Sequence, residues 1–546
     1  MKKLPLYLLK NNLKRLKSLP KLNRKYHTII LQSGLSIWNK QIKIALKNLG
    51  SDVHEIEFRK CTINSYKFLL DILRCVPKVQ RIIFASVDMR QDETQKIKSQ
   101  LMKKLTTLVL IESDWKVPNF NLFFNALYFI LISFSFIFQL FEFFSSSELE
   151  VLKVKSNNDI RTEYLTEFLS IQHNLETLAL RNINDDIENS NIFESDFSKN
   201  IKFKLKHLSI DIFGDDTSTD NLKAFLQKHE DSLEDLEIGK SFADAVYEYC
   251  FTKFRNLKKL TINADKIPKD SQFYNRLRPN ISVKKLIIRG KLNDFTTKEL
   301  FGQFPKVETL VVNEKNSDYE GMNMSIELMI FMSNNLNSLK HLVIPKLPSD
   351  VPADTLKFPA LKSFHIERMT TKTDWTTFIQ SNPTIERLSY RWLMFPNIIT
   401  KVEYEILAKS LLNLQYLTLG SGITDHIGTL TYIAQNFRSL KVLNYSDIAV
   451  NSMEVLNKID KESLRISFYI YETDNLPFPE EVNLWSNELK RQLFDIDEDF
   501  STSGSSSGSG GDWQDNWNSD DELMDINDES SDNSENDEVV IFPFLR

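Results

Sequence analysis

The sequence predicts an α/β fold, specifically a solenoid or horseshoe with a parallel β-sheet on its concave side and helices on its convex side. A Leu-x-x-Leu-x-Leu motif recurs about fifteen times, most often at steps of roughly 22 to 32 residues, which is the mark of a repeat protein. Short amphipathic segments lie between the copies. At 546 residues the chain is long for one compact domain, whereas a solenoid lengthens without enlarging its core.

The motif is clearest at Leu175-Glu-Thr-Leu178-Ala-Leu180. Its last two apolar positions are two residues apart, so a short strand directs both side chains to one face, which we expect to be the core. A last strand is expected at Leu464-Arg-Ile466-Ser-Phe468. The copies begin in chain order at Val53, Val79, Leu105, Leu149, Leu175, Leu205, Leu233, Leu257, Val283, Val307, Leu339, Leu361, Ile385, Leu414 and Leu440.

Helices are expected between the strands. Tyr164, Leu165, Phe168 and Leu169 recur at helical spacing, and similar groups lie at 68–73, 222–226 and 375–379. Each strand–helix unit has one apolar face and must bury it against its neighbours. An ordinary α/β domain with parallel strands is the alternative, which the recurrent period disfavours. The pattern resembles the leucine-rich repeat family, most closely its long-repeat intracellular branch, as found in F-box/leucine-rich-repeat proteins.

Four regions follow from the pattern: a helical segment over residues 1–47, the repeats over 48–475, a cap or linker over 476–494, and a tail over 495–546. The tail contains a Gly/Ser-rich stretch and, over its whole length, sixteen Asp and Glu with a single Arg. Residues 1–494 therefore keep 67 Lys and Arg against 58 Asp and Glu. We expect a disordered acidic tail on a basic body.

The N-terminal segment resembles a degenerate or shortened F-box. It opens on Leu4-Pro5, continues through spaced leucines to Tyr26 and Ile30, and reaches Ile37-Trp38. The resemblance implies docking onto a Skp-type adaptor of a cullin ubiquitin ligase. A helical cap over the open end of the repeats is the alternative. The residues that the resemblance assigns to adaptor binding are Leu4, Pro5, Leu8, Leu22, Tyr26, Ile30 and Trp38.

An apolar insert interrupts the repeats at about 117–146. Residues 120–144 are almost wholly apolar, with Glu142 as the single charge, and the step from Leu105 to Leu149 is 44 residues. By length and hydropathy this stretch is a candidate membrane span. A span here would divide the stack of repeats, and this argues against a membrane crossing. A loop or helix packed on the repeats, and translated non-coding sequence, are the other two interpretations.

The concave face is the expected binding surface. Side chains that flank the inward leucines face outward there, and charges of both signs alternate along it. Such a surface suits a protein partner better than nucleic acid, which favours a stripe of one sign. Lys259, Lys285 and Arg289 lie on adjacent repeats, where they would accept an acidic segment. The predicted partner-binding residues are Lys259, Lys285, Arg289, Arg387 and Arg391.

The sequence gives no sign of catalysis. It has no Gly-rich phosphate loop and no Cys/His spacing typical of zinc, so we expect no cofactor, no metal and no enzyme activity. Cys61, Cys75 and Cys250 are too few and too scattered for a disulfide framework, and no secretory signal is visible. A cytoplasmic or nuclear location is therefore expected.

The predicted function is that of a non-catalytic substrate-recognition subunit of a cullin-type ubiquitin ligase. In that interpretation the repeats hold a target protein and the N-terminal segment tethers the ligase. A stand-alone repeat scaffold without a ubiquitin role is the alternative. A single-span membrane-anchored repeat protein is a more distant one.

Overall fold

The fold is described from a computed structural model, and every described residue belongs to the first of two units that divide at Ser501. The described residues are 6–8, 28–32, 46–47, 53–59, 61–63, 66–85, 87–89, 104–111, 144, 147–155, 162–184, 193, 199–213, 219–239, 242–264, 267–290, 294–313, 324–348, 355–369, 372–393, 401–419, 426–446 and 465–469.

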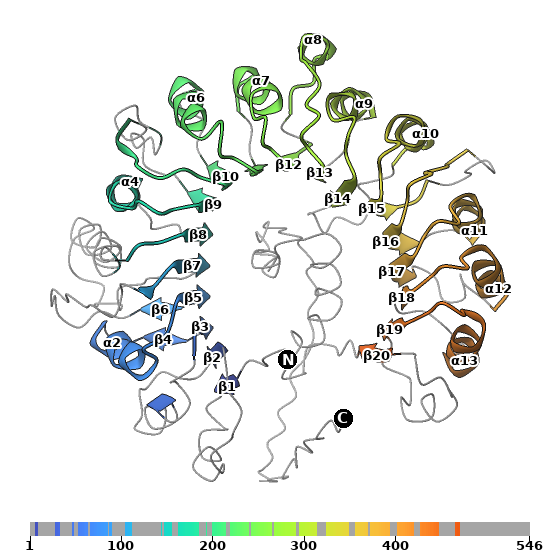
Figure 1. The fold of residues 1–546 in the computed structure, drawn as a ribbon, viewed down its shortest axis with the longest axis horizontal. Helices are drawn as coiled ribbons and strands as arrows, with labels where there is room; N and C mark the ends of the chain where they lie inside the picture. The colour runs from blue at the N-terminus through green and yellow to red at the C-terminus, as the bar shows by residue number, and fades with distance from the viewer. Residues whose placement is uncertain are drawn as a thin grey trace, which may run out of the picture. The chain divides into compact units, whose positions relative to one another are not determined.

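One curved parallel sheet contains eighteen of the described strands, and they pair in chain order (Figure 1). Its strands are β1 (Leu6–Leu8), β2 (Thr28–Gln32), β3 (Glu55–Arg59), β5 (Arg81–Ala85), β7 (Thr107–Ile111), β8 (Val151–Lys155), β9 (Thr177–Asn184), β10 (His207–Phe213), β11 (Asp235–Ile238), β12 (Lys259–Asn263), β13 (Lys285–Arg289), β14 (Thr309–Asn313), β15 (His341–Lys346), β16 (Ser363–Met369), β17 (Arg387–Leu393), β18 (Tyr416–Leu419), β19 (Val442–Ser446) and β20 (Arg465–Tyr469). A separate two-stranded sheet joins β4 (Thr62–Ile63) to β6 (Asp88–Met89).

The strands are aligned so that equivalent motif positions stand opposite each other. Leu178 of β9 pairs with Leu208 of β10, and Leu208 pairs with Leu236 of β11. Just before each strand one carbonyl accepts two amides of the next repeat: Glu176 O accepts from Lys206 N at 2.8 Å and from His207 N at 3.0 Å. The same pair of hydrogen bonds to one carbonyl recurs between successive repeats from His54 to Gln415. The predicted solenoid and all fifteen predicted repeat strands are confirmed, as is the last strand, β20.

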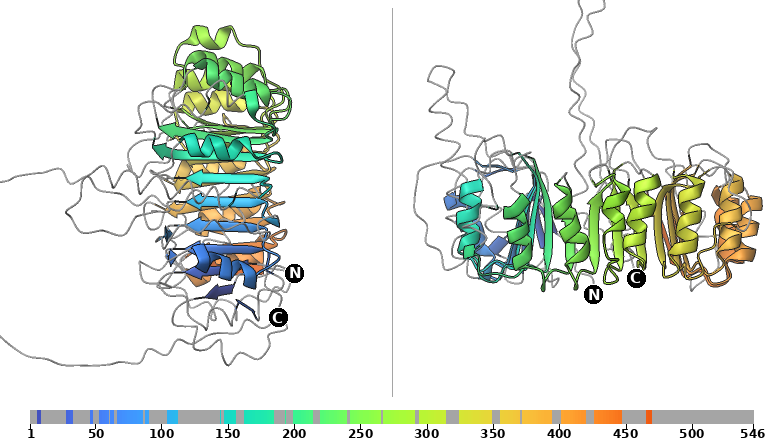
Figure 2. Two further views of the ribbon diagram at one scale, coloured as in Figure 1. Left: turned by 90° about the vertical axis from the view of Figure 1, so that its left-hand side faces the viewer. Right: turned by 90° about the horizontal axis from the view of Figure 1, so that it is seen from above.

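The helices lie on the outer side of the curve and cover the core side of the sheet (Figures 1 and 2). Each presents an apolar face inward; in α6 the buried residues are Leu222, Phe225 and Leu226. The helices expected from the sequence are confirmed as α2, α4, α6 and α11. The described helices are α2 (Tyr66–Cys75), α4 (Thr162–Ser170), α6 (Thr219–Lys228), α7 (Asp244–Thr252), α8 (Ser271–Asn275), α9 (Asp294–Gln303), α10 (Ile326–Asn335), α11 (Lys372–Ser381), α12 (Lys401–Ser410) and α13 (His426–Asn436).

The described residues of the N-terminal segment include strands where the sequence predicts a helical segment. Residues 6–8 and 28–32 are strands β1 and β2, which extend the sheet beyond β3, and Leu46 and Lys47 are helical. Ile29 and Leu31 are buried in the common core, at the period-two spacing of the motif. The run Thr28-Ile29-Ile30 favours a strand because β-branched side chains fit a pleated, half-buried surface. Repeat-like strands therefore begin before Val53.

The apolar insert leaves the sheet continuous. Strands β7 and β8, on either side of it, pair from Thr107↔Val151 to Ile111↔Lys155. Phe144, at the end of the apolar run, is fully buried, and its ring centroid is 6.5 Å from that of Phe84. Residues 112–143 lie outside the described residues. Within the part that is described, no helix combines the length and apolar character needed to cross a bilayer.

A row of charges of both signs follows the edge where the strands begin. These side chains belong to the residue directly after the first motif leucine, and several neighbours along the row form ion pairs. Each pair is exposed and contributes little free energy. The pairs are Glu176–Lys206, Glu234–Lys258, Glu308–Lys340 and Lys362–Glu386, each at 2.6 Å.

Buried polar side chains tie each repeat to the one before it. They lie in the turn between helix and strand and bond to the backbone of the preceding repeat, so they satisfy groups that would otherwise be buried without partners. Gln172 Oε1 accepts from Leu149 N at 3.0 Å, and His229 Nδ1 accepts from Leu205 N at 3.2 Å. Asn382 makes the same kind of link.

His229 is expected to make the fold sensitive to mild acid. Burial, with Lys204 and Lys228 nearby, lowers the pKa of His229 to about 3 from its ordinary 6.5. The stability due to the neutral ring is complete above pH 6.5 and is lost as the pH falls below that value. Between pH 7.5 and pH 5 this term changes by about 2 kcal/mol. Urea unfolding of the wild type and of His229→Gln at both pH values measures it. Gln is the matched replacement because Gln172 makes the same contact; equal pH dependence in the two proteins would contradict the prediction.

The three cysteines are buried free thiols, as expected from their scatter. Burial raises the pKa of the Cys61 thiol to about 12 and also raises that of Cys250. The thiolate is the reactive form, so these two side chains pack as small apolar groups. The predicted cap or linker, 476–494, and the predicted acidic tail, 495–546, lie outside the described residues and stay predictions.

Candidate functional site

The candidate site lies on the concave face of the sheet between β8 and β15. In each strand the residues that alternate with the buried motif leucines face this side, so the face is built from equivalent positions of successive repeats. A shallow hollow there encloses only about 50 Å³. That is far below the roughly 300 Å³ at which small-molecule pockets begin. The arrangement is an open surface.

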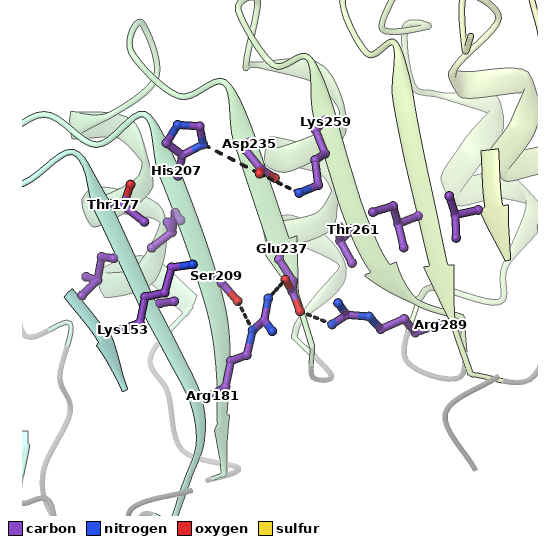
Figure 3. Close-up of a pocket in the computed structure, with 15 residues that line it drawn as sticks. Lys153, Thr177, Arg181, His207, Ser209, Asp235, Glu237, Lys259, Thr261 and Arg289 are labelled. Atoms are coloured by element: carbon purple, nitrogen blue, oxygen red, sulfur yellow. Dashed lines mark hydrogen bonds and ion pairs between the residues drawn. The ribbon is translucent and has the colours of Figure 1, made fainter. Parts of the chain in front are cut away.

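A buried ion-pair network crosses the centre of this face (Figure 3). Glu237 of β11 lies between Arg181 of β9 and Arg289 of β13, and each arginine reaches over one intervening strand to bond it. Arg181 Nε also donates to Ser209 Oγ at 2.8 Å on the strand between. The side chains of Arg181 and Glu237 are each 9% exposed, and that of Arg289 is 20% exposed. The network thus joins residues of four strands, β9, β10, β11 and β13, within a span of five neighbouring repeats.

A second cluster lies nearer the beginning of the same strands. Asp235 Oδ2 is 3.0 Å from Lys259 Nζ and 3.7 Å from His207 Nδ1 (Figure 3). Lys259 is thereby paired with a carboxylate of the neighbouring strand. The pair is only partly exposed, so water screens it less than it screens the charges along the sheet edge.

Both carboxylates are held in the charged form. Burial alone would raise the pKa of Glu237, but Arg289, Arg181 and Lys259 together outweigh it and hold the pKa below its ordinary value. Burial likewise opposes the charge of Asp235, while the contacts of His207 and Lys259 lower the pKa of that carboxyl. Near neutral pH the five groups Arg181, Arg289, Lys259, Glu237 and Asp235 carry a net charge of +1.

Next to the network the concave face becomes apolar. Ile287, Val311 and Val343 occupy the middle position of β13, β14 and β15 and form a cluster separate from the main core. They are 1% to 5% exposed, because side chains of adjacent strands crowd together on the inner side of a curved sheet. The site therefore has an ionic part over β8–β13 and an apolar floor formed by the middle positions of β13–β15.

Cations outnumber anions on the described part of this face. Among the described side chains of strands β8–β17 that face this side, the carboxylates are Asp235 and Glu237. The resulting positive potential would attract acidic groups of a partner. The cations are Lys153, Lys155, Arg181, Lys259, Lys285, Arg289 and Arg387.

The predicted partner-binding residues are all on this sheet. Lys259 lies on β12 opposite Lys285 of β13, and Arg289 lies four residues further along β13; Lys259 and Arg289 are also engaged by Asp235 and Glu237. The guanidinium of Arg387 lies 4.8 Å from the centre of the Tyr416 ring. Arg391 belongs to β17, and its side chain is not described. Their role in binding stays a prediction.

The predicted adaptor-binding residues are only partly described. Leu8 and Ile30 lie in β1 and β2, without described side chains. The rest lie outside the described residues: Leu4, Pro5, Leu22, Tyr26 and Trp38.

Two parts of the site were missed at the sequence level. One is the reach of Arg181 and Arg289 to Glu237, which joins residues 56 and 52 positions apart and leaves no local signal. The other is the apolar floor, whose signal is visible: Leu286-Ile287-Ile288 and Leu310-Val311-Val312 place an apolar residue where most repeats have a polar one. Within the described residues, no three His, Cys, Asp or Glu side chains are grouped to hold a metal ion.

Comparisons with known proteins add little beyond the fold. No protein-family model matches the sequence, and no curated protein matches it. A solved complex of Rad7 and Elc1 in yeast is 12% identical, covers 84% of this chain and 87% of that chain, and has a TM-score of 0.28. The Toll–Spatzle complex of Drosophila is 11% identical, covers 81% and 55%, and has a TM-score of 0.32. Values this low carry no argument about function. The fold itself defines the class, an α/β leucine-rich repeat solenoid.

Proposed function

We propose that this chain is a non-catalytic leucine-rich repeat protein whose concave face binds another protein. The observation that carries the proposal is the composition of that face: an ordered, net-cationic centre beside an apolar floor, on a sheet that spans successive repeats. Paired strands and the Arg181–Glu237–Arg289 network hold these side chains in place before binding. A preorganised surface loses less conformational entropy when a partner docks.

The composition favours a protein over the alternatives. A nucleic acid carries a phosphate at every nucleotide, so some of its phosphates would lie where the cations are already paired with Asp235 and Glu237, and it would gain nothing from Ile287, Val311 and Val343. A small molecule would find too little enclosed volume. A polypeptide offers both carboxylates and apolar side chains, and its backbone can follow an open curved surface.

A charge-reversal experiment tests the proposal. The full chain is used to capture partners from cell extract, and a captured protein is then purified and titrated against the purified chain. Lys285→Glu with Arg387→Glu is expected to weaken binding at least tenfold, because both reversed residues lie on the concave sheet. Lys306→Glu with Lys409→Glu makes the same change in net charge at exposed positions away from the concave sheet, and should leave affinity within about twofold. Equal loss in both double variants would place the binding surface elsewhere.

The finer form of the proposal is a substrate receptor of a cullin-type ubiquitin ligase, in the cytoplasm or nucleus. It is supported by the resemblance of the N-terminal segment to an F-box. A stand-alone scaffold is the second candidate, favoured by β1 and β2, because they make part of that segment an extension of the sheet. Pulldown with a purified Skp-type adaptor separates the two. The ligase form predicts binding that is lost in Tyr26→Ala with Trp38→Ala, and the scaffold form predicts no binding by either protein.

A further inference from the structure

We infer that the partner segment bound on the concave face is acidic and extended, and that it crosses the strands from β8 to β15 with its carboxylates at two separate positions. This inference deepens the proposed protein-binding function and rests on it. It follows from where the cations stand, what lies between them, and what borders them.

The cations form two groups, each on a pair of adjacent strands. The first group is on β8 and β9, where Lys155 and Arg181 are register partners and Lys153 lies on the same face of β8. The second is on β12 and β13, where Lys259 and Lys285 are register partners. Strands β10 and β11 separate the two groups. We call them the first and the second cationic station.

The spacing of the stations sets the spacing of the carboxylates. Four strand intervals separate the middle of the β8–β9 pair from that of the β12–β13 pair, which is about 19 Å at about 4.8 Å per interval. Lys155 and Arg181 also stand four register positions further along their strands than Lys259 and Lys285, which adds about 13 Å along the strands. The stations are therefore about 23 Å apart, and an extended chain that advances about 3.3 Å per residue covers this distance in about seven residues. A segment with two acidic sites about seven residues apart would match both stations at once.

The concave surface over β10 and β11, between the two stations, can accommodate an uncharged stretch of the partner segment. The carboxylates there are already engaged: Glu237 with Arg181 and Arg289, and Asp235 with Lys259. They therefore do not present an unpaired negative charge to an incoming segment. Ser209 and Thr261 flank Glu237 on β10 and β12 and add polar groups rather than further charge.

Beyond the second cationic station the concave surface of the sheet is apolar. Ile287 shares β13 with Lys285, and Val311 and Val343 follow on β14 and β15. A bulky apolar residue of the segment is expected to settle over these strands, about two to three residues past the second acidic site. The full pattern is therefore acidic, neutral, acidic and then apolar. An evenly acidic chain would leave the apolar floor unmatched.

A panel of labelled 14-residue peptides tests this pattern by fluorescence anisotropy with the full chain at low salt. The parent peptide carries two Glu pairs about seven residues apart in a Ser/Gly background, followed by Leu and Phe. A second peptide has the reversed order, because the segment could run in either direction across the strands. One of the two is expected to bind. Reducing the spacing to three residues, or replacing Leu and Phe by Ser, is expected to weaken binding about fivefold. Replacing Glu by Lys should abolish it.

Protein variants supply the other half of the test. Lys153→Gln with Lys285→Gln removes one charge from each station without touching the Arg181–Glu237–Arg289 network. It is expected to weaken the parent peptide about tenfold, whereas Lys306→Gln with Lys409→Gln should not. Circular dichroism verifies that each variant is folded.

The inference is overturned if neither parent peptide binds, if Lys peptides bind equally well, or if spacing has no effect. If partner capture still depends on Lys285 and Arg387 when one of these results is found, the proposed function stands, and only the acidic, two-position pattern is refuted. Loss of that dependence would remove the proposed function as well.

Discussion

Glu237→Gln is expected to lower the free energy of unfolding by about 3 kcal/mol, because it leaves the buried Arg181 without its counter-charge. Arg289, which is more exposed, can turn toward water, so most of the cost is expected from Arg181. The measurement is urea unfolding followed by circular dichroism, with the slope checked for a change in cooperativity. Because the pKa of Glu237 is lowered, its contribution is complete above pH 4.5 and is lost as the pH falls below that value.

Glu308→Gln is the matched control for this prediction. Glu308 also contacts two cations, Lys284 and Lys340, but it stands on the exposed edge row with a side chain that is 33% exposed. Its loss is expected to cost less than about 1 kcal/mol. The double variant Arg181→Met with Glu237→Leu should recover most of the stability lost in Glu237→Gln, since it removes the unpaired charge. Equal costs for Glu237→Gln and Glu308→Gln would show that the network is not buried as described.

Asn382→Ala is the second substitution with a large expected effect: it should lower the free energy of unfolding by about 3 kcal/mol. Asn382 is 1% exposed; its Oδ1 accepts from Phe358 N at 2.8 Å, and its Nδ2 donates to Leu356 O at 2.8 Å and Phe378 O at 2.7 Å. Alanine leaves the amide of Phe358 and the carbonyl of Leu356 buried without those bonds, and each such loss costs roughly 1 to 3 kcal/mol. Unfolding in urea gives the difference directly.

Asn436→Ala is the matched control for Asn382→Ala. Asn436 is the last residue of α13, as Asn382 is the first after α11, and it also donates to a carbonyl four residues earlier, Tyr432 O at 2.8 Å; it is exposed, and its bond stays within its own helix. Its replacement is expected to cost less than about 0.5 kcal/mol, the usual size of a surface change. If Asn436→Ala were as costly as Asn382→Ala, the buried link between repeats would not be the source of the effect.

The repeat strands were predictable because their cause is local and periodic. Leu-x-x-Leu-x-Leu fixes which side chains enter the core, and the spacing of copies fixes which strands are neighbours. The same logic should have identified β2, since Ile29 and Leu31 show the same alternation; the resemblance to a helical F-box outweighed it. Proline and leucine at the start of the chain are weaker signals than a strand pattern at the right distance from the next repeat.

The site was predictable only in part. Sequence placed Lys259, Lys285 and Arg289 on adjacent repeats, because register follows from the motif. It did not show that both Arg181 and Arg289 bond to Glu237, since that depends on each arginine side chain reaching over one intervening strand and on the curvature of the sheet. Lys259 and Arg289 therefore act in the fold as well as on the surface, which a list of outward-facing charges cannot reveal.

Site-specific photocross-linking tests the central claim most directly, namely that the concave face of a continuous repeat sheet is the protein-binding surface. A photoreactive amino acid is placed at Thr309, on the concave side of β14, and in a separate protein at Val402, which is 60% exposed on the outer helix α12. Each protein is mixed with the partner purified in the capture experiment and irradiated. The account predicts a cross-linked product from position 309 and none from position 402. A product from position 402 alone would contradict it.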